Sequence, residues 1–236
     1  MGTSVESSGR TTAAFFDLDK TIIARSSTLA FAPSFYRHGL ITRSQVCRGA
    51  VAQLSFRMAG ASHDRMERIR DQVSALCCGW PADVVAQIVT DGLRQTIVPH
   101  VYAEARSLLA RHLRDGHDVI IVSTSGQEIA GPIGAMLGAT EVIATRLEVA
   151  DGRYTGSVAF YAYGQAKADH VSALATKRGY QLADCFAYSD SVTDLPLLEL
   201  VGHPHVVNPD RSLRKVARAR RWPELTFRQT DRDPVA

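Results

Sequence analysis

The sequence predicts an α/β protein, with a parallel β-sheet covered by helices on both faces and a small all-helical segment inserted after the first strand. Three observations lead to this fold class. An apolar run from Thr12 to Phe16 has the character of a short buried strand and precedes any helical pattern. For about 75 residues after Thr21, apolar residues recur at helical spacing. From Pro99 onward, short β-branched runs alternate with helical patterns.

The composition is that of an ordinary globular protein. Of 236 residues, 45% are hydrophobic and 22% are charged, and the net charge is +3. The basic excess gathers in residues 211–221, which is typical of a solvated helix face, so we expect no nucleic-acid partner. No stretch approaches the roughly 18 apolar residues of a spanning helix, which argues against stable membrane insertion. Four cysteines without metal-ligand spacing favour reduced thiols and a cytoplasmic location: Cys47, Cys77, Cys78 and Cys185.

Residues 25–97 are expected to form the helical insert, with an apolar core of its own. The sheet core then comprises residues 12–24 and 98–228, while residues 1–11 are expected to be disordered and residues 229–236 to form a loose tail. Capping and breaking residues divide the insert into helices at Ser27 to His38 with a restart at Pro33, Thr42 to Gly60, Ser62 or Asp64 to Cys77, and Pro81 to Thr96.

The second half alternates between strands and helices. Asp151-Gly152 is the turn of a predicted hairpin between two strands, Ala144 to Val149 and Tyr154 to Val158. Four further strands or strand ends are predicted at 118–122, 184–188, 205–207 and 225–227, and helices at 100–114, 127–137, 167–177, 195–201 and 211–220.

Asp17 and Asp19 are the most informative pair in the chain. They follow the first strand at positions i and i+2, which places both side chains on one side of the strand. Two neighbouring carboxylates repel each other unless a positive group lies between them, and a hard divalent cation such as Mg²⁺ prefers oxygen ligands of this kind. The alternative is a solvated acidic turn that caps a helix.

Other polar residues also fall at predicted strand ends. Ser123 and Thr124 follow a buried strand and lead into a helix, an arrangement suited to binding an anion. Asp190 and Asp194 follow a later strand. Lys167 lies near a helix N-terminus, where its charge opposes the helix dipole unless an anion is nearby. Because parallel strands end at one edge of a sheet, these groups are expected to meet there and to form a phosphate and metal site.

Taken in order, four motifs resemble those of the haloacid dehalogenase-like (HAD) hydrolase superfamily, subfamily IB, whose members include phosphoserine phosphatases. The motifs are Asp17-Leu18-Asp19-Lys20-Thr21, then Ser123, then Lys167, and last Asp190 with Asp194. The resemblance covers nearly all of residues 12–227. It implies a Rossmann-like HAD fold with a C1-type helical cap after the first strand, and a phosphoric monoester hydrolase.

The same resemblance implies roles for the acidic residues. Asp17 would attack phosphorus and become a transient aspartyl-phosphate. Asp19 would protonate the leaving alcohol and then activate water. The carboxylates of Asp17 and Asp190 and the backbone carbonyl of Asp19 would hold Mg²⁺, the implied cofactor. Asp194 would orient Lys167 or a metal-bound water.

Phosphoryl oxygens would be held by a hydroxyl, a backbone N–H group and an ammonium group, which stabilise charge in the transition state. The residues implied in phosphate or substrate binding are Thr21, Ser123, Thr124, Lys167 and Thr193.

The chain departs from phosphoserine phosphatases where the substrate is recognised. Ser26 occupies the position at which phosphoserine phosphatases share a glutamate. In the fourth motif, Ser189, Ser191 and Thr193 occupy positions where those enzymes have glycines and an asparagine. The expected substrate is therefore a small phosphorylated metabolite other than phosphoserine alone. Its leaving group would meet either the insert's arginines or its phenylalanines, namely Arg25, Arg48 and Arg57 or Phe31 and Phe35.

Two alternatives use the same fold. A phosphotransferase would pass the phosphoryl group from the aspartate to an acceptor alcohol instead of water. A non-catalytic binding protein would use the basic helix Arg211 to Arg221, although no motif residue is lost. We expect a monomer or homodimer.

Overall fold

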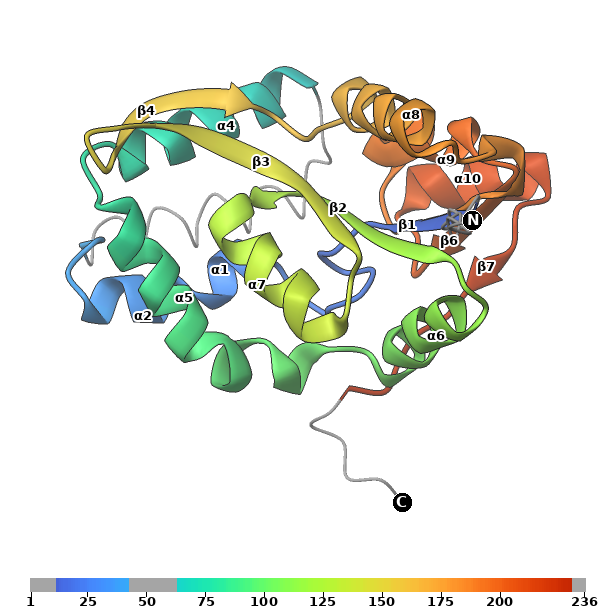
Figure 1. Cartoon of the computed structure of the whole chain (residues 1–236), viewed down its shortest axis with the longest axis horizontal. Helices are drawn as coiled ribbons and strands as arrows, with labels where there is room; N and C mark the ends of the chain where they lie inside the picture. Colours follow the sequence, from blue (N-terminus) through green and yellow to red (C-terminus); the bar gives the residue numbers. More distant parts are fainter. Residues whose placement is uncertain (1–11, 43–62, 231–236) are drawn as a thin grey trace, which may run out of the picture.

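A computed structural model describes residues 12–42 and 63–230. Its centre is a seven-stranded sheet in the order β4-β3-β2-β1-β5-β6-β7 (Figure 1). Every neighbouring pair is parallel except β3 and β4, which form a hairpin. The predicted α/β fold class is therefore confirmed. The strands are β1 Ala13–Phe16, β2 Asp118–Gly126, β3 Glu141–Ala150, β4 Arg153–Phe160, β5 Phe186–Ser189, β6 His203–Val207 and β7 Glu224–Leu225.

Helices occupy the insert and the connections between strands. Between β1 and β2 lie α1 Ser27–Ala30, α2 Ala32–Arg37, α4 His63–Cys77 and α5 Ala82–Thr96. The predicted helix from Thr42 to Gly60 falls almost wholly outside the described residues. The later helices are α6 Ala103–Arg114, α7 Gln127–Leu137, α8 Gln165–Arg178, α9 Leu195–Leu200 and α10 Arg211–Arg220, with 3₁₀ turns at η1 Val98–His100, η2 Leu182–Asp184 and η3 Val192–Asp194.

Strand β1 is buried on both faces of the sheet. Ala14 and Phe16 pack into an apolar cluster with residues of α5, α6 and α7. Ala13 and Phe15 point the other way and pack with residues of α8, α9 and α10. This alternation explains why the strand is apolar at every position, as central strands of parallel sheets are. It also holds the end of β1, and so Asp17, rigidly between two layers of helices.

The described residues of the helical insert do not form an apolar core of their own, contrary to the prediction. Its buried side chains, among them Phe31 and Val85, belong to the same cluster as Ile129 and Ile133 of α7. The close fit extends to Gly92 of α5, where an added Cβ would lie 3.3 Å from the Phe31 ring. Because α5 packs against α7, the insert and the sheet domain share one interior.

The hairpin joins the insert to the sheet from the other side. Its turn is Asp151-Gly152, as predicted, and both residues have positive φ angles, 49° and 74°. The first half of β3 pairs with β2, and the second half pairs with β4. Strand β4 then packs on α4 (Figure 1), and the Arg153 guanidinium donates to the Gly79 carbonyl at 2.7 Å.

Several boundaries differ from the predictions. Helix α6 begins at Ala103 and not at residue 100, because the segment with Pro99 forms the 3₁₀ turn η1. Strand β2 continues through Gly126, so Ser123 and Thr124 lie within a strand and not after it. Gln229, the first residue of the predicted loose tail, is held at the start of α6, because its carbonyl accepts from the Ala103 N–H at 2.9 Å.

Within the described residues, no helix combines the length and the apolar character needed to cross a bilayer. Cys77, Cys78 and Cys185 are free thiols, and Cys47 lies outside the described part of the chain.

Candidate active site

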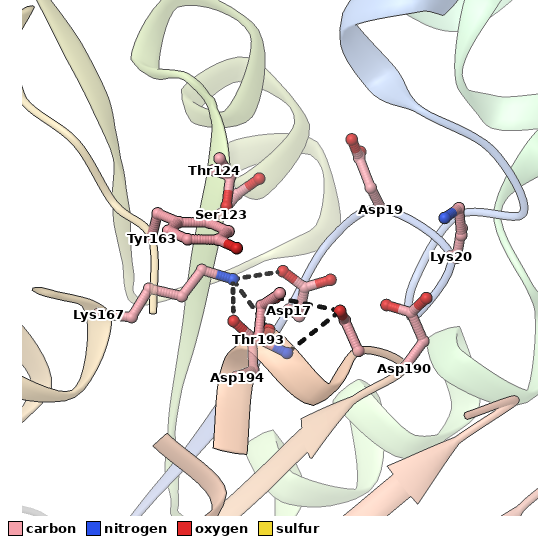
Figure 2. A pocket seen from close by; sticks show the side chains of 11 residues that line it. Asp17, Asp19, Lys20, Ser123, Thr124, Tyr163, Lys167, Asp190, Thr193 and Asp194 are labelled. Carbon is pink, nitrogen blue, oxygen red and sulfur yellow. Dashed lines mark hydrogen bonds and ion pairs between the residues drawn. The ribbon is translucent and has the colours of Figure 1, made fainter. Parts of the chain in front are cut away.

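The polar strand ends meet around a cavity of about 150 Å³ at one edge of the sheet (Figure 2). The cavity is lined by Asp17, Asp19, Lys20, Ser123, Thr124, Tyr163, Lys167, Asp190, Ser191, Thr193 and Asp194. All predicted site residues except Thr21 are in this set.

Lys167 lies between two carboxylates at the centre of the site. Its Nζ is 2.7 Å from Asp17 Oδ1 and 2.9 Å from Asp194 Oδ1. The lysine is 1% exposed, so both ion pairs are shielded from water. Burial alone would lower the pKa of Lys167, but the two carboxylates outweigh burial and raise it above the usual value. Lys167 is therefore a permanent cation in the site. Asp194 is held in turn by the Ser189 hydroxyl at 2.8 Å.

Gly164 sets the direction in which α8 begins. Its backbone angles are φ 55° and ψ −125°, a combination that residues with a Cβ strongly disfavour. The turn starts α8 immediately beyond it, so that Lys167 lies in the first helical turn and points into the cavity. Glycine at position 164 therefore permits the turn that places Lys167 in the site.

Asp190 approaches Asp17 from the end of β5. The Thr21 hydroxyl lies between the two, 3.4 Å from Asp17 Oδ2 and 3.5 Å from Asp190 Oδ1. Thr21 is fully buried and does not line the cavity. The structure therefore places it beneath the carboxylates and not where the predicted substrate-binding role would need it.

Asp17 and Asp190 are buried carboxylates that repel each other. Burial raises the pKa of Asp17 to about 7, although the Lys167 ammonium opposes that rise. Burial and then the charge of Asp17 raise the pKa of Asp190 well above its usual value. Among the described residues, no group of three or more His, Cys, Asp and Glu side chains is arranged to ligate a metal. Two buried carboxylates that repel each other are nevertheless a fitting donor set for Mg²⁺, which takes few protein ligands and retains others from water or phosphate.

Asp19 lines the cavity on the side opposite Lys167 (Figure 2). Its Oδ1 accepts from the Ser27 backbone N–H at 2.9 Å, and its Oδ2 accepts from the Ser125 hydroxyl at 3.2 Å. Burial raises the pKa of Asp19, and these hydrogen bonds moderate the rise. The carboxyl group is therefore separated from the cationic side of the site, which favours a group that gains and loses a proton.

Ser123 and Thr124 lie near the C-terminal end of β2 and line the cavity. The Ser123 hydroxyl accepts from the Ser125 N–H at 3.1 Å, which orients it. The Thr124 hydroxyl instead donates to the Ala162 carbonyl at 2.9 Å. Ser123 is thus the better placed of the two hydroxyls to turn toward an anion.

Tyr163 also lines the cavity, although no sequence signal identified it. It lies beside Thr124 and Lys167 (Figure 2), and burial followed by the charge of Asp194 raises the pKa of its hydroxyl. Its position one residue before Gly164 was the only available clue. Lys20 and Ser191 were also missed as lining residues, although both lie inside motifs that the sequence singled out.

The described residues of the insert contribute less to the cavity than predicted. Phe31 and Phe35 are buried in the shared apolar cluster, and neither lines the cavity. The structure thus removes the predicted apolar contact to a leaving group. Arg25 is exposed and pairs with His100 at 3.0 Å, whereas Arg48 and Arg57 lie outside the described residues.

The cavity therefore combines a buried ion-paired lysine with a pair of buried carboxylates, and comparison with known proteins shows the family to which such a chain belongs. A family model described as haloacid dehalogenase-like hydrolase matches residues 14–199, and the chain therefore belongs to this family.

Relatives define the protein further as a phosphatase. The chain is 54% identical over 216 residues to a probable phosphatase of Mycobacterium tuberculosis, covering 92% of this chain and 75% of the relative. It is 32% identical over 220 residues to a phosphoserine phosphatase of the same organism, covering 92% and 71%. A protein of Streptomyces azureus, 56% identical over 217 residues with 92% and 78% covered, is described as an inhibition of morphological differentiation protein.

Solved structures share the fold. A protein of unknown function from Bordetella pertussis Tohama I has a TM-score of 0.80 at 27% identity, covering 92% of this chain and 98% of that chain. A substrate-bound phosphoserine phosphatase has a TM-score of 0.66 at 17% identity, with 94% of each chain covered. The second similarity is too low in sequence to indicate more than a common architecture.

Proposed function

We propose that the protein is a Mg²⁺-dependent phosphomonoesterase that hydrolyses a small phosphorylated metabolite through an aspartyl-phosphate on Asp17. The observation that carries this proposal is the arrangement around Asp17. One of its oxygens is paired with Lys167, 2.7 Å away, while the other lies near Thr21 on the side of Asp190. A carboxylate held at both oxygens and open to a cavity is well placed to act as a nucleophile.

In the first step, an Asp17 oxygen forms a bond to phosphorus while the ester P–O bond breaks. The electron pair of that bond moves to the leaving oxygen, which takes a proton from Asp19. In the second step, Asp19 takes a proton from water, the water oxygen bonds to phosphorus, and the bond to Asp17 breaks. Inorganic phosphate leaves, and both aspartates return to their starting states.

Lys167 and the end of β2 supply charge stabilisation in both steps. The Lys167 ammonium and the Ser123 hydroxyl border the cavity, where donors that are already oriented are effective. Asp194 keeps Lys167 in place through the second ion pair of 2.9 Å. When bound, Mg²⁺ held by the Asp17 and Asp190 carboxylates and the Asp19 carbonyl would neutralise phosphoryl charge and favour the ionised carboxylates.

Substrate selection is proposed to differ from that of phosphoserine phosphatases. Ser26, at the position where those enzymes resemble one another in a glutamate, is the N-cap of α1, and its hydroxyl accepts from the Leu29 N–H at 3.5 Å. It therefore brings no negative charge that would attract a substrate ammonium group. The polar residues that line the cavity suit a phosphate ester, without identifying its alcohol.

Phosphate release from p-nitrophenyl phosphate and a panel of phosphomonoesters tests this proposal. Wild-type protein is expected to release phosphate with Mg²⁺ and not with excess chelator, and Asp17→Asn is expected to abolish release. Asp169→Asn is the matched control, because Asp169 is exposed on α8 and accepts a hydrogen bond from Gln165 of the same helix at 2.9 Å. Release that is unaffected by chelator, or that survives in Asp17→Asn, would refute the mechanism.

The acceptor can be tested in the same reactions. With a candidate acceptor alcohol present, a hydrolase yields inorganic phosphate equal to the alcohol released from the donor ester. A shortfall of phosphate, matched by a new phosphate ester, would instead identify a phosphotransferase.

A further inference from the structure

We propose that Ser125, with Ser27 behind it, is a positioning residue that holds the Asp19 carboxyl group for proton transfer to the leaving alcohol. This inference rests on the proposed function, in which Asp19 is the acid. Neither serine belongs to the motifs from which the site was predicted, and neither lines the cavity. Their hydroxyls act on Asp19 alone among the proposed catalytic carboxylates.

The contacts form a compact bridge between two elements. Ser125, near the end of β2, donates its hydroxyl proton to Asp19 Oδ2 at 3.2 Å. Its Oγ is also 2.8 Å from Ser27 Oγ and 3.1 Å from Thr28 Oγ1, both on α1. A hydroxyl has one proton and two lone pairs. When Ser125 donates to Asp19, its remaining partners therefore have to donate to it, and all three hydroxyls are then oriented.

Burial protects this bridge from water. Ser27 is fully buried and Ser125 is 8% exposed, so water cannot readily replace a lost hydroxyl. Oδ1 of Asp19 is already occupied by the Ser27 backbone N–H at 2.9 Å, a donor that cannot reverse. The transferable proton therefore belongs on Oδ2. Ser125 faces that atom, and a hydroxyl can donate to it when it is ionised and accept from it when it is protonated.

The same bridge fixes the side-chain direction. Without Ser125 Oγ, Asp19 would lose the hydroxyl that is bonded to Oδ2 and would keep its contacts with the start of α1, among them the Ser27 backbone N–H. Ser125→Ala removes the hydroxyl and leaves the backbone unchanged. The Ser125 backbone N–H therefore still donates to the Ser123 hydroxyl and orients it. The variant is therefore expected to impair proton donation without disturbing the phosphate-facing part of β2.

Dependence on the leaving group separates proton donation from all other effects. p-Nitrophenolate leaves without help from an acid, whereas an alkoxide requires protonation as the ester bond breaks. We would measure kcat/KM, which covers binding and the first chemical step, for p-nitrophenyl phosphate and for an alkyl phosphate that wild type hydrolyses. The proteins are wild type, Ser125→Ala, Ser125→Thr, Asp19→Asn and Ser34→Ala. Ser34 is a matched control, because it is buried on α2 and its hydroxyl contacts Arg37 at 3.1 Å and not the site.

We expect Ser125→Ala to lower kcat/KM for the alkyl ester by roughly 10- to 100-fold, within the range of general acid catalysis, and for p-nitrophenyl phosphate by less than about threefold. Ser125→Thr, which retains the hydroxyl, is expected to recover most of the alkyl activity. Ser34→Ala is expected to match wild type. If Ser125→Ala does not fold, Ser27→Ala is the substitute, with the same direction and a smaller effect, because Thr28 still contacts Ser125.

An equal loss for both esters, or no loss for either, would overturn the inference. Asp19→Asn distinguishes this failure from failure of the proposed function. If Asp19→Asn is selective for the leaving group and Ser125→Ala is not, only the role of Ser125 is wrong. If Asp19→Asn shows no selectivity, the acid is wrongly assigned. If wild type hydrolyses neither ester, the proposed function is wrong. Both proposals fall in either case.

Discussion

Replacing Lys167 with methionine should destabilise the folded protein strongly, in addition to removing activity. At 2.7 Å and an effective dielectric constant of about 20, the attraction between Lys167 and Asp17 alone is about 6 kcal/mol. Part of that attraction offsets the cost of burying the charges, so the measurable loss on breaking a buried pair is about 3–5 kcal/mol. Lys167→Met retains the length of the side chain but leaves Asp17 and Asp194 without their buried cation.

The free energy of unfolding is to be measured by urea denaturation at pH 8 without Mg²⁺. Lys167→Met is expected to lower it by about 3 kcal/mol or more, and the loss should shrink at pH 5, where the stranded carboxylates can take up protons. Lys177→Met is the control, because Lys177 is exposed in the last turn of the same helix. An unchanged urea midpoint at pH 8, or a loss that does not depend on pH, would refute the electrostatic account.

Two further predictions concern pH. Burial raises the pKa of Asp17 from 3.8 to about 7. Between these two pH values the folded state therefore keeps a proton that the unfolded chain has lost. The stability that this group contributes is present below pH 3.8 and is lost as pH rises through 7. Mg²⁺ is therefore expected to raise Tm more at pH 8 than at pH 5, and to lose most of this effect in Asp17→Asn; an equal rise at both pH values would contradict the reasoning. His112 behaves in the opposite way: burial, then His117 and Arg111, lower its pKa from 6.5 to about 4, so the unfolded chain binds more protons and stability falls as pH drops from 6.5 to 4. The loss is at most about 3 kcal/mol, and His112→Gln, compared with wild type at each pH to cancel the aspartates, is expected to flatten that decline; parallel curves for the two proteins would show that His112 does not titrate in this way.

The elements with strong local signals were predicted well. The Asp151-Gly152 turn was recognised because a hairpin turn of this kind needs two positive φ angles. Helix α10, Arg211–Arg220, has the predicted bounds, because Asp210 caps it through its side chain and Leu213 and Ala217 mark its buried face. Such features depend on a few neighbouring residues.

Predictions failed where packing between distant segments decides the outcome. The apolar residues of the insert were correctly assigned to helices, but their spacing does not say which surface they cover. Phe31 therefore looked available to a substrate, although it is fully buried in the cluster shared with α7. The end of β2 was set too early, because pairing with β3 through Thr145 extends the strand to Gly126.

The sequence by itself determined which reactive groups the protein has and that they converge. Strand ends in a parallel sheet lie at one edge, so Asp17, Ser123 and Asp190 had to be neighbours once the α/β pattern was recognised. Only the tertiary structure decided how each group is held. The placement of Thr21 beneath the carboxylates and the hydroxyl bridge from Ser125 to Asp19 depend on the packing of α1 against β2 and β5 against β1. Contacts of that kind arise between residues about 100 or more positions apart, and local propensity carries no information about them.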